Sequence, residues 1–328
     1  MKEYPPDSNN PLLEDEKSYI ISSVSRITEM NISSINKIVY TRGAPFGNNI
    51  LSFNKIIFFC EILKCNEIAV INKNFWFLKN NMSMILNGRN ISINIIEKLE
   101  YNISSNGENR GYLVSDTLYC TSLWPLFYSY KIKSKIRIHK LRDEIINNLP
   151  KVNISKNDLY IHIRSGDIFS TWIHRPYAQP PLCFYTSIIK NFVFRKIYII
   201  SENNKNPIVD KLTNKFRNII YSKNDLKYDM SFLINSYNLV CSISSFAIST
   251  IIFNANLENV FEYNLYPMNQ KILHYHYDLF EFYYKFTIYR MEPSSNYKNK
   301  MFSWKNNKMQ RKLMMKEKCI NDFIISRN

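Results

Sequence analysis

The chain has 328 residues and a net charge of +16, with 45% hydrophobic and 15% aromatic residues. This composition excludes a disordered chain and leaves enough apolar material for two domains of ordinary size. No uninterrupted apolar stretch approaches the roughly 18 residues that a membrane-spanning helix needs. Residues 1–17 read as a flexible polar leader without the apolar core of a signal peptide. We expect no membrane association from this chain, and either a cytoplasmic protein or a Golgi or ER lumenal one whose anchor is not part of this sequence.

The excess of positive charge first suggests nucleic acid as a partner. The lysines are spread along the chain, however, and are dense only at 131–140 and 298–318. No RNP, zinc-finger or helix-turn-helix signature accompanies them. The pattern therefore favours an anionic small substrate and argues against nucleic acid.

The six cysteines show no C-x-x-C spacing, and Cys60 and Cys241 lie inside apolar runs. We expect most of them to be small buried hydrophobic residues, and we predict no metal site. Five N-x-S sequons would be acceptors in a secretory compartment, but a chain rich in Asn, Ile and Ser also produces such triplets by chance: Asn31, Asn81, Asn90, Asn102 and Asn153.

The first predicted unit is a strand, a loop and a helix. Residues 36–41 are typical of a strand, and apolar residues at helical spacing begin at Ile50. The intervening loop contains Gly47 and Asn48. Such a turn directs backbone N–H groups at an anion, although any strand-to-helix turn can carry glycines. Further strands are expected at 67–71 and 91–96.

A long helix is predicted for residues 131–149, where apolar residues follow one face. Pro150 ends it and 151–157 is polar, so we place a domain boundary there. The chain is thus divided into a leader (1–17), an N-terminal domain (18–150), a C-terminal domain (151–270) and a helical extension that packs back (271–328).

The most informative stretch is Asp158–Phe169, which reads D-L-Y-I-H-I-R-S-G-D-I-F. A short buried strand runs directly into Arg164 and Gly166, and a glycine at a strand end indicates a positive φ or a close approach of ligand. A planar guanidinium at the carboxyl end of a central strand suits a bidentate grip on phosphate. The alternative is that Arg164 pairs with Asp167 across a surface turn and His162 is a core histidine.

The rest of the chain alternates helices and strands. Helices are expected at 182–192, from Pro207 onward, at 229–237 and from about 246 to 254, and Asn206 is the expected N-cap of the second of these. Strands are expected at 196–200 and 239–243, and the last strand is expected at 259–263. This order predicts a parallel sheet with helices on both faces. Glu202 and Ser244-Ser245 would then end two strands beside Arg164. The serines, like Asp229, could instead be plain N-caps.

These pieces together resemble the superfamily of α1,2-, α1,6- and protein-O-fucosyltransferases. The resemblance rests on H-x-R-x-G-D, on a Gly-Asn pair that opens a helix, and on Asp229 followed by Ser-Ser-Phe. The tail around Trp304-Lys305-Asn306 with Gln310 is loosely similar to that of distant members. Paired arginines occur at the motif in the α1,6 and nodulation-type members, whereas this chain has Arg164-Ser165, which points away from those subfamilies.

The resemblance implies a GT-B fold, in which two Rossmann-like α/β domains with parallel sheets face a cleft. In such a fold the domain 18–150 lies on the acceptor side and the domain 151–270 binds the nucleotide sugar. It implies inverting fucosyl transfer from GDP-fucose to a glycan or protein hydroxyl, with no cofactor and no metal, and no D-x-D motif is present. Carried over, Arg164 holds the β-phosphate, and the other donor-binding residues are His162, Gly166, Asp167, Asp229, Ser244, Ser245, Phe246, Gly47 and Asn48.

The acceptor hydroxyl needs a base, and Asp167, Glu202 and His174 remain open as candidates; with Arg164, the first two form the expected catalytic set. Two alternatives also remain open. One is a transferase that uses another nucleotide sugar. The other is a degenerate glycosyltransferase fold that binds polyanions or nucleic acid through its basic surface.

Overall fold

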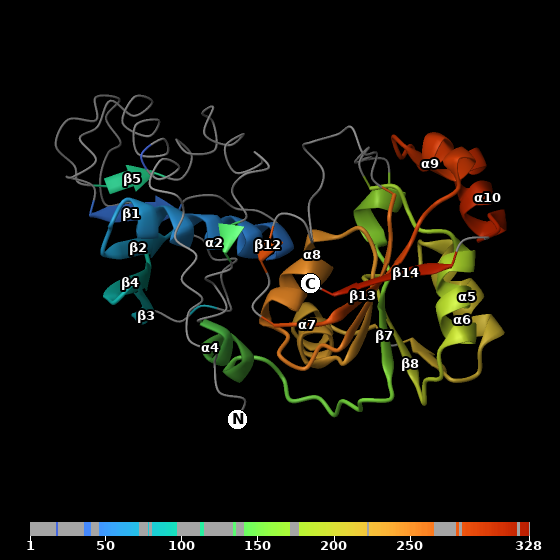
Figure 1. Cartoon of the computed structure of the whole chain (residues 1–328), viewed down its shortest axis with the longest axis horizontal. Coiled ribbons are helices and arrows are strands. Elements are labelled where there is room, and N and C mark those ends of the chain that lie inside the picture. The colour runs from blue at the N-terminus through green and yellow to red at the C-terminus, as the bar shows by residue number, and fades with distance from the viewer. Residues whose placement is uncertain are drawn as a thin grey trace. The chain divides into compact units, whose positions relative to one another are not determined.

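Figure 1 shows the computed structural model of the chain, which describes residues 18, 36–40, 46–71, 78, 81–96, 112–114, 134–135, 141–170, 177–221, 223–265, 280–281, 284–319 and 322–327. The contacts within the chain divide it into two compact units, one of residues 1–44 and 52–137 and the other of residues 45–51 and 138–328. Among the described residues, no helix combines the length and the apolar character needed to cross a membrane.

The first unit contains a five-stranded sheet in the order β3-β4-β2-β1-β5. Its strands are β1 (Lys37–Tyr40), β2 (Glu67–Val70), β3 (Met82–Leu86), β4 (Arg89–Ile95) and β5 (Tyr112–Val114). All pairs are parallel except β3 with β4, which form a hairpin around Asn87 and Gly88. Both hairpin residues have positive φ, 48° and 75°, as a tight two-residue turn requires. The predicted strands 36–41, 67–71 and 91–96 are thus confirmed.

Helix α2 (Phe46–Ile62) follows β1. Its residues Phe53, Ile57 and Cys60 are fully buried, as their helical spacing predicted. The guanidinium of Arg89 on β4 donates to the carbonyl of Glu61 at 3.2 Å and of Cys65 at 3.2 Å, and so satisfies carbonyl groups at the end of the helix.

The second unit contains a seven-stranded sheet in the order β14-β13-β11-β10-β7-β8-β9. Its strands are β7 (Leu159–His162), β8 (Ile197–Ile200), β9 (Ile219–Tyr221), β10 (Asn238–Cys241), β11 (Asn259–Tyr263), β13 (Thr287–Met291) and β14 (Phe323–Arg327). All pairs are parallel except β13 with β14. The chain builds outward from β7 to β9 and then returns to place β10 on the other side of β7. The strand order therefore reverses between β7 and β10, the point where open α/β sheets bind ligands.

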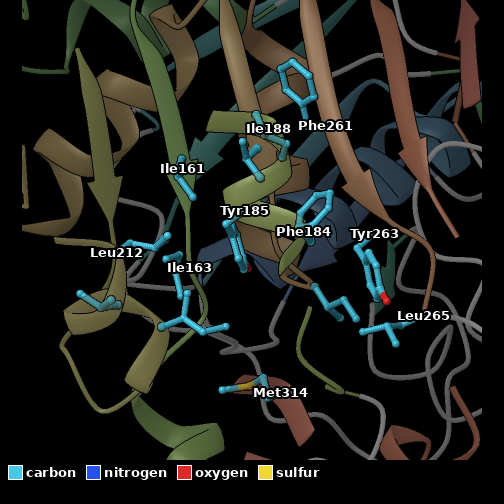
Figure 2. Close-up of a cluster of buried hydrophobic side chains, with 14 of the residues drawn as sticks. Ile161, Ile163, Phe184, Tyr185, Ile188, Leu212, Phe261, Tyr263, Leu265 and Met314 are labelled. Carbon is cyan, nitrogen blue, oxygen red and sulfur yellow. The ribbon is translucent and has the colours of Figure 1, made fainter. Parts of the chain in front are cut away.

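Helices cover both faces of this sheet (Figure 1), as the alternating pattern predicted. They are α5 (Leu182–Asn191), α6 (Pro207–Lys215), α7 (Leu226–Asn235) and α8 (Ser245–Phe253). Figure 2 shows Ile161 and Ile163 packed with Phe184, Tyr185 and Leu212 of α5 and α6. On the opposite face, Tyr160 stacks on Tyr198 and on Phe232 of α7, with ring centroids 5.0 and 5.9 Å away. Because side chains alternate along β7, His162 belongs to the α7–α8 face.

Several elements differ from the sequence prediction. Of the long helix expected at 131–149, the described residues contain α4 (Arg142–Asn147), whereas Ser134–Lys135 form strand β6. Residues 138–150 belong by their contacts to the second unit. The strand 259–263 is not the last one, because the 271–328 segment supplies β12 (Phe280–Glu281), β13 and β14 besides helices α9 (Ser295–Met301) and α10 (Lys308–Lys316). The leader 1–17 lies outside the described residues.

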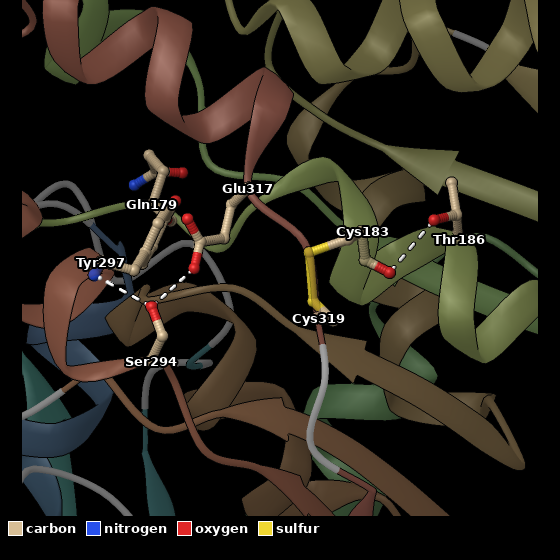
Figure 3. The surroundings of a disulfide bond; sticks show 7 residues. All are labelled: Gln179, Cys183, Thr186, Ser294, Tyr297, Glu317 and Cys319. Carbon is tan, nitrogen blue, oxygen red and sulfur yellow. Dashed lines mark hydrogen bonds between the residues drawn. A yellow bond between two sulfur atoms is a disulfide. The ribbon is translucent and has the colours of Figure 1, made fainter.

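The C-terminal segment is held to the second unit by a disulfide between Cys183 of α5 and Cys319 (Figure 3). Nearby, the hydroxyl of Ser294 donates to Glu317 at 2.6 Å and accepts the backbone N–H of Tyr297 at 3.1 Å. The expectation of buried thiols is wrong for Cys183 and Cys319. It holds for Cys60, Cys65 and Cys241, which are buried.

Candidate functional site

The turn after β7 is built around Gly166. The strand is followed by three extended residues and a short 3-10 turn, Gly166–Phe169, in which Gly166 has a φ of +67°. A Cβ atom at this position would lie 1.8 Å from Oε2 of Glu202, which follows β8. The backbone angle therefore favours glycine, and any Cβ here would force the Glu202 carboxylate to move away. The predicted positive φ of Gly166 is confirmed, and Glu202 lies beside it.

Arg164 is paired with Asp167, as the alternative interpretation of the motif expected. Its Nη2 lies 2.9 and 2.8 Å from the two carboxylate oxygens of Asp167. The guanidinium carbon also lies 5.1 Å from the ring centroid of Tyr177. This pair uses a single nitrogen, however, and the buried Nε of Arg164 has no hydrogen-bond partner among the described residues. A buried donor without a partner costs about 1–3 kcal/mol unless a ligand or water satisfies it.

His162 lies in a buried hydrogen-bond cluster with Ser242. Its Nδ1 is 2.8 Å from the Ser242 hydroxyl, which also accepts the backbone N–H of Arg164 at 3.0 Å. Burial, reinforced by the charge of Arg164, lowers the pKa of His162 to about 3, so the ring is neutral at physiological pH. The arrangement that satisfies all three groups has the Ser242 hydroxyl donating to Nδ1, which leaves the proton of His162 on Nε2.

Three polar side chains of the β8–α6 loop and the motif hold the turn in place. Asn203 Oδ1 accepts from the Ser165 hydroxyl at 2.7 Å and from the Gly166 N–H at 3.3 Å. Asn206 Nδ2 donates to the carbonyl of Arg164 at 3.0 Å, while its Oδ1 accepts from Ile208 and caps α6. The capping role of Asn206 was predicted and is confirmed. Its second role and those of Asn203 and Ser242 were missed, because their partners lie 37–80 residues away.

Ser244, Ser245 and Phe246 begin α8 directly after β10. The Ser244 hydroxyl accepts the Phe246 N–H at 3.2 Å and is the N-cap of the helix, so the plain capping interpretation is confirmed for this serine. The Phe246 ring centroid lies 5.6 Å from that of His162. The helix N-terminus, with its partial positive charge, is therefore brought beside the motif at the reversal of strand order.

Asp229 is not an N-cap, because α7 begins at Leu226 and is capped by Asp225. Asp229 is buried inside the helix, and its Oδ1 has no partner among the described residues. Burial raises its pKa from 3.8 to about 7, and a hydrogen bond from Asn224 partly opposes the shift. The carboxyl group therefore changes charge near neutral pH.

Some predicted site residues are not brought to the motif by the described contacts. Gly47 and Asn48 were predicted in the loop before the helix, but α2 begins at Phe46 and includes both in its first turn. Their side chains lie outside the described residues. His174 also lies outside them. Within the described ranges, no three His, Cys, Asp or Glu side chains are close enough together to hold a metal ion.

The C-terminal helices contact the motif turn directly. Trp304 is fully buried and donates its indole N–H to the carbonyl of Ile168 at 2.8 Å. Its ring makes an edge contact with Phe169 at 5.4 Å between centroids. Gln310, also singled out in the sequence, accepts the N–H of Lys305 at 2.7 Å and donates to the carbonyl of Lys300 at 3.0 Å, and so fixes the turn between α9 and α10.

Comparison of the chain with family models, with curated proteins and with solved structures found no match. The functional interpretation therefore depends on the residues of this chain and on the geometry described above.

Proposed function

We propose that this chain is a glycosyltransferase of GT-B architecture that transfers fucose from GDP-fucose, with inversion, to a protein or glycan hydroxyl. The observation that carries the proposal is the Arg164 guanidinium. It stands where the strand order reverses, and it keeps a buried Nε–H without a partner although its Nη2 is bound to Asp167. A diphosphate oxygen would satisfy this donor and neutralise the charge.

Two neighbouring groups favour the same anion. With its Nδ1 bound to Ser242, neutral His162 can present Nε2–H as a second donor. The N-terminus of α8 adds a partial positive charge without any titratable group. Preorganised donors of this kind stabilise the charge that develops on a leaving diphosphate more than they stabilise the ground state.

Glu202 is the better placed of the two described candidates for the base. Asp167 is already paired with Arg164, whereas Glu202 is exposed and makes no ion pair among the described residues. In the proposed step the acceptor oxygen forms a bond to the sugar C1 and the bond from C1 to the diphosphate oxygen breaks. The bonding electrons leave with the diphosphate, and the acceptor proton passes to Glu202.

The disulfide supports a secretory location for this activity. Bonds such as Cys183–Cys319 persist in oxidising compartments and are rare in the cytosol. Three of the sequon asparagines, Asn81, Asn90 and Asn153, are exposed and could be modified there.

Calorimetry with GDP and GDP-fucose in the absence of metal tests the proposal. We expect micromolar binding by the wild type that is lost in Arg164→Ala, because the guanidinium supplies the phosphate contact. Arg217→Ala is the matched control, since Arg217 is exposed in the loop between α6 and β9 at the opposite edge of the sheet. A wild-type protein that binds no GDP contradicts the proposal. Binding of UDP but not of GDP would be consistent with a glycosyltransferase and would contradict GDP-fucose as its donor.

A further inference from the structure

The C-terminal helices α9 and α10 concentrate the positive charge of the chain. Residues 295–318 contain seven lysines and one arginine but a single acidic residue, Glu317, whose carboxylate accepts from Ser294. Most of the basic side chains are exposed: Lys300, Lys305, Lys308, Arg311, Lys312, Lys316 and Lys318. A surface of this kind attracts an anionic partner.

This basic surface is rigidly joined to the motif turn. Trp304 donates to Ile168 at 2.8 Å, and the guanidinium of Arg311 lies 5.7 Å from the ring centroid of Phe169. Tyr297 of α9 donates to the carbonyl of Gln179 at 2.7 Å, and the Cys183–Cys319 disulfide fixes the segment that follows α10. The backbone that carries the lysines is therefore held close to the turn that contains Arg164. Binding a membrane or a polyanion does not require a fixed position relative to the Arg164 turn, whereas placing an acceptor hydroxyl there does.

Apolar side chains are exposed among the lysines. Phe302 follows α9 and is 42% exposed, and Met309 in the first turn of α10 is 50% exposed. A flexible methionine packs well against an apolar side chain, a contact that a phosphate group cannot make. The surface thus combines sites for carboxylates with sites for apolar side chains, which is the chemistry of an acidic peptide.

We propose that α9 and α10 form the docking surface for an acidic peptide segment of the acceptor protein. The acceptor class named here rests on the proposed glycosyltransferase function. The segment binds along the lysines of α10 and so brings a neighbouring serine or threonine hydroxyl to the turn that carries Arg164 and Glu202.

The test uses a fluorescently labelled poly-L-glutamate peptide and charge reversal on α10. Lys308→Glu/Lys312→Glu changes two exposed lysines that are four residues apart, and a glutamate in the first turn of a helix is favourable. Lys211→Glu/Lys215→Glu makes the same change in charge at the same spacing on α6. We expect the α10 variant to bind poly-L-glutamate about tenfold more weakly and the α6 variant to bind it as the wild type does. Wild-type binding should weaken as salt is added.

The outcomes separate this inference from the proposed function. If both variants lose the same affinity for poly-L-glutamate, or if the α10 variant loses none, the proposed docking surface is wrong. If duplex DNA or phosphatidylserine vesicles bind more tightly than poly-L-glutamate does, and lose affinity in the α10 variant, an acidic peptide is not the partner of this surface. GDP binding is measured on the same preparations. The α10 variant should still bind GDP, whereas Arg164→Ala should lose GDP binding and retain poly-L-glutamate binding. A wild type that binds poly-L-glutamate but no GDP contradicts the transferase alone.

Discussion

Gly166 shows most directly how one residue shapes the candidate site. Its φ of +67° strains any other residue, and a Cβ built there lies 1.8 Å from Glu202 Oε2, so that carboxylate would have to move. We predict that Gly166→Ala costs about 1–2 kcal/mol in backbone strain and also displaces the Glu202 carboxylate. GDP affinity and transfer activity should both fall, as measured by calorimetry and by a GDP-release assay.

Two variants separate strain from displacement at this position. Gly88 has a similar φ of +75°, and a Cβ there would meet nothing within 4 Å. Gly88→Ala should therefore show comparable strain with unchanged GDP affinity. Adding Glu202→Ala to Gly166→Ala removes the clash and should recover part of the GDP affinity while transfer stays low. Full GDP affinity in Gly166→Ala alone would show that the turn does not contribute to donor binding.

Asp229 makes the free energy of unfolding fall as the pH rises. Burial raises its pKa from 3.8 to about 7, so between these values the unfolded chain releases a proton that the folded chain keeps. The stabilisation is complete below pH 3.8 and is lost as the pH rises through about 7. We predict that Asp229→Asn removes this contribution, which amounts to about 1.4 kcal/mol per pH unit for one proton. Urea unfolding at a series of pH values measures it, and Asp225→Asn, which keeps the cap of α7, should retain most of the decline.

His162 acts in the opposite direction over the same range. Its pKa is lowered from 6.5 to about 3, so the unfolded chain binds a proton that the folded chain excludes. Stability from this group is present above pH 6.5 and is lost as the pH falls towards 3. His162→Gln should therefore make stability fall more steeply with rising pH, whereas Asp229→Asn should make it rise. Parallel curves for the two variants would contradict both assignments.

At the scale of elements, the β8–α6 loop supports the turn that carries Arg164. Asn206 caps α6 through Oδ1 and donates to the Arg164 carbonyl through Nδ2 at 3.0 Å. Asn206→Asp keeps the capping oxygen but replaces the donor with a second acceptor facing that carbonyl. We predict a loss of about 1–3 kcal/mol in the free energy of unfolding and weaker GDP binding, measured by denaturant titration and calorimetry.

The N-cap of α10 provides the control for this change. Asn307 accepts from the Gln310 N–H at 2.9 Å, and that is the one side-chain contact it makes among the described residues. Because aspartate caps helices as well as asparagine does, Asn307→Asp should be nearly neutral. If Asn206→Asp lowers the free energy of unfolding no more than Asn307→Asp does, the hydrogen bond from Asn206 to the Arg164 carbonyl does not contribute to stability.

At the scale of the whole molecule, the disulfide closes a loop between residues 136 positions apart in the sequence. A cross-link over so long a loop lowers the conformational entropy of the unfolded chain and so stabilises the folded state by about 3–5 kcal/mol. We predict that dithiothreitol lowers the melting temperature of the second unit and has no effect on Cys183→Ser/Cys319→Ser. A melting temperature that is the same with and without reductant in the wild type would show that the bond is not formed.

The sequence by itself determined those features that depend on neighbouring residues. The apolar run before Arg164 predicted a buried strand, Asn206-Pro207 predicted the start of α6, and Gly166 predicted a positive φ, all of which the structure confirms. Alternation of strands and helices likewise predicted a parallel sheet covered on both faces. These features follow from hydrogen bonding and steric limits within a few residues, which the local pattern records.

Only the tertiary structure decided which distant groups meet. Ser242 joins His162 to the backbone of Arg164 because β10 lies beside β7, and Trp304 reaches Ile168 from 136 residues away. Asp229 lies inside α7 rather than at its cap because Asp225 begins the helix, and its burial sets its pKa. Strands β13 and β14 extend the sheet through pairing that no local pattern specifies. Sheet order and long-range burial are properties of the whole folded unit, since each depends on surfaces contributed by residues far apart in the chain.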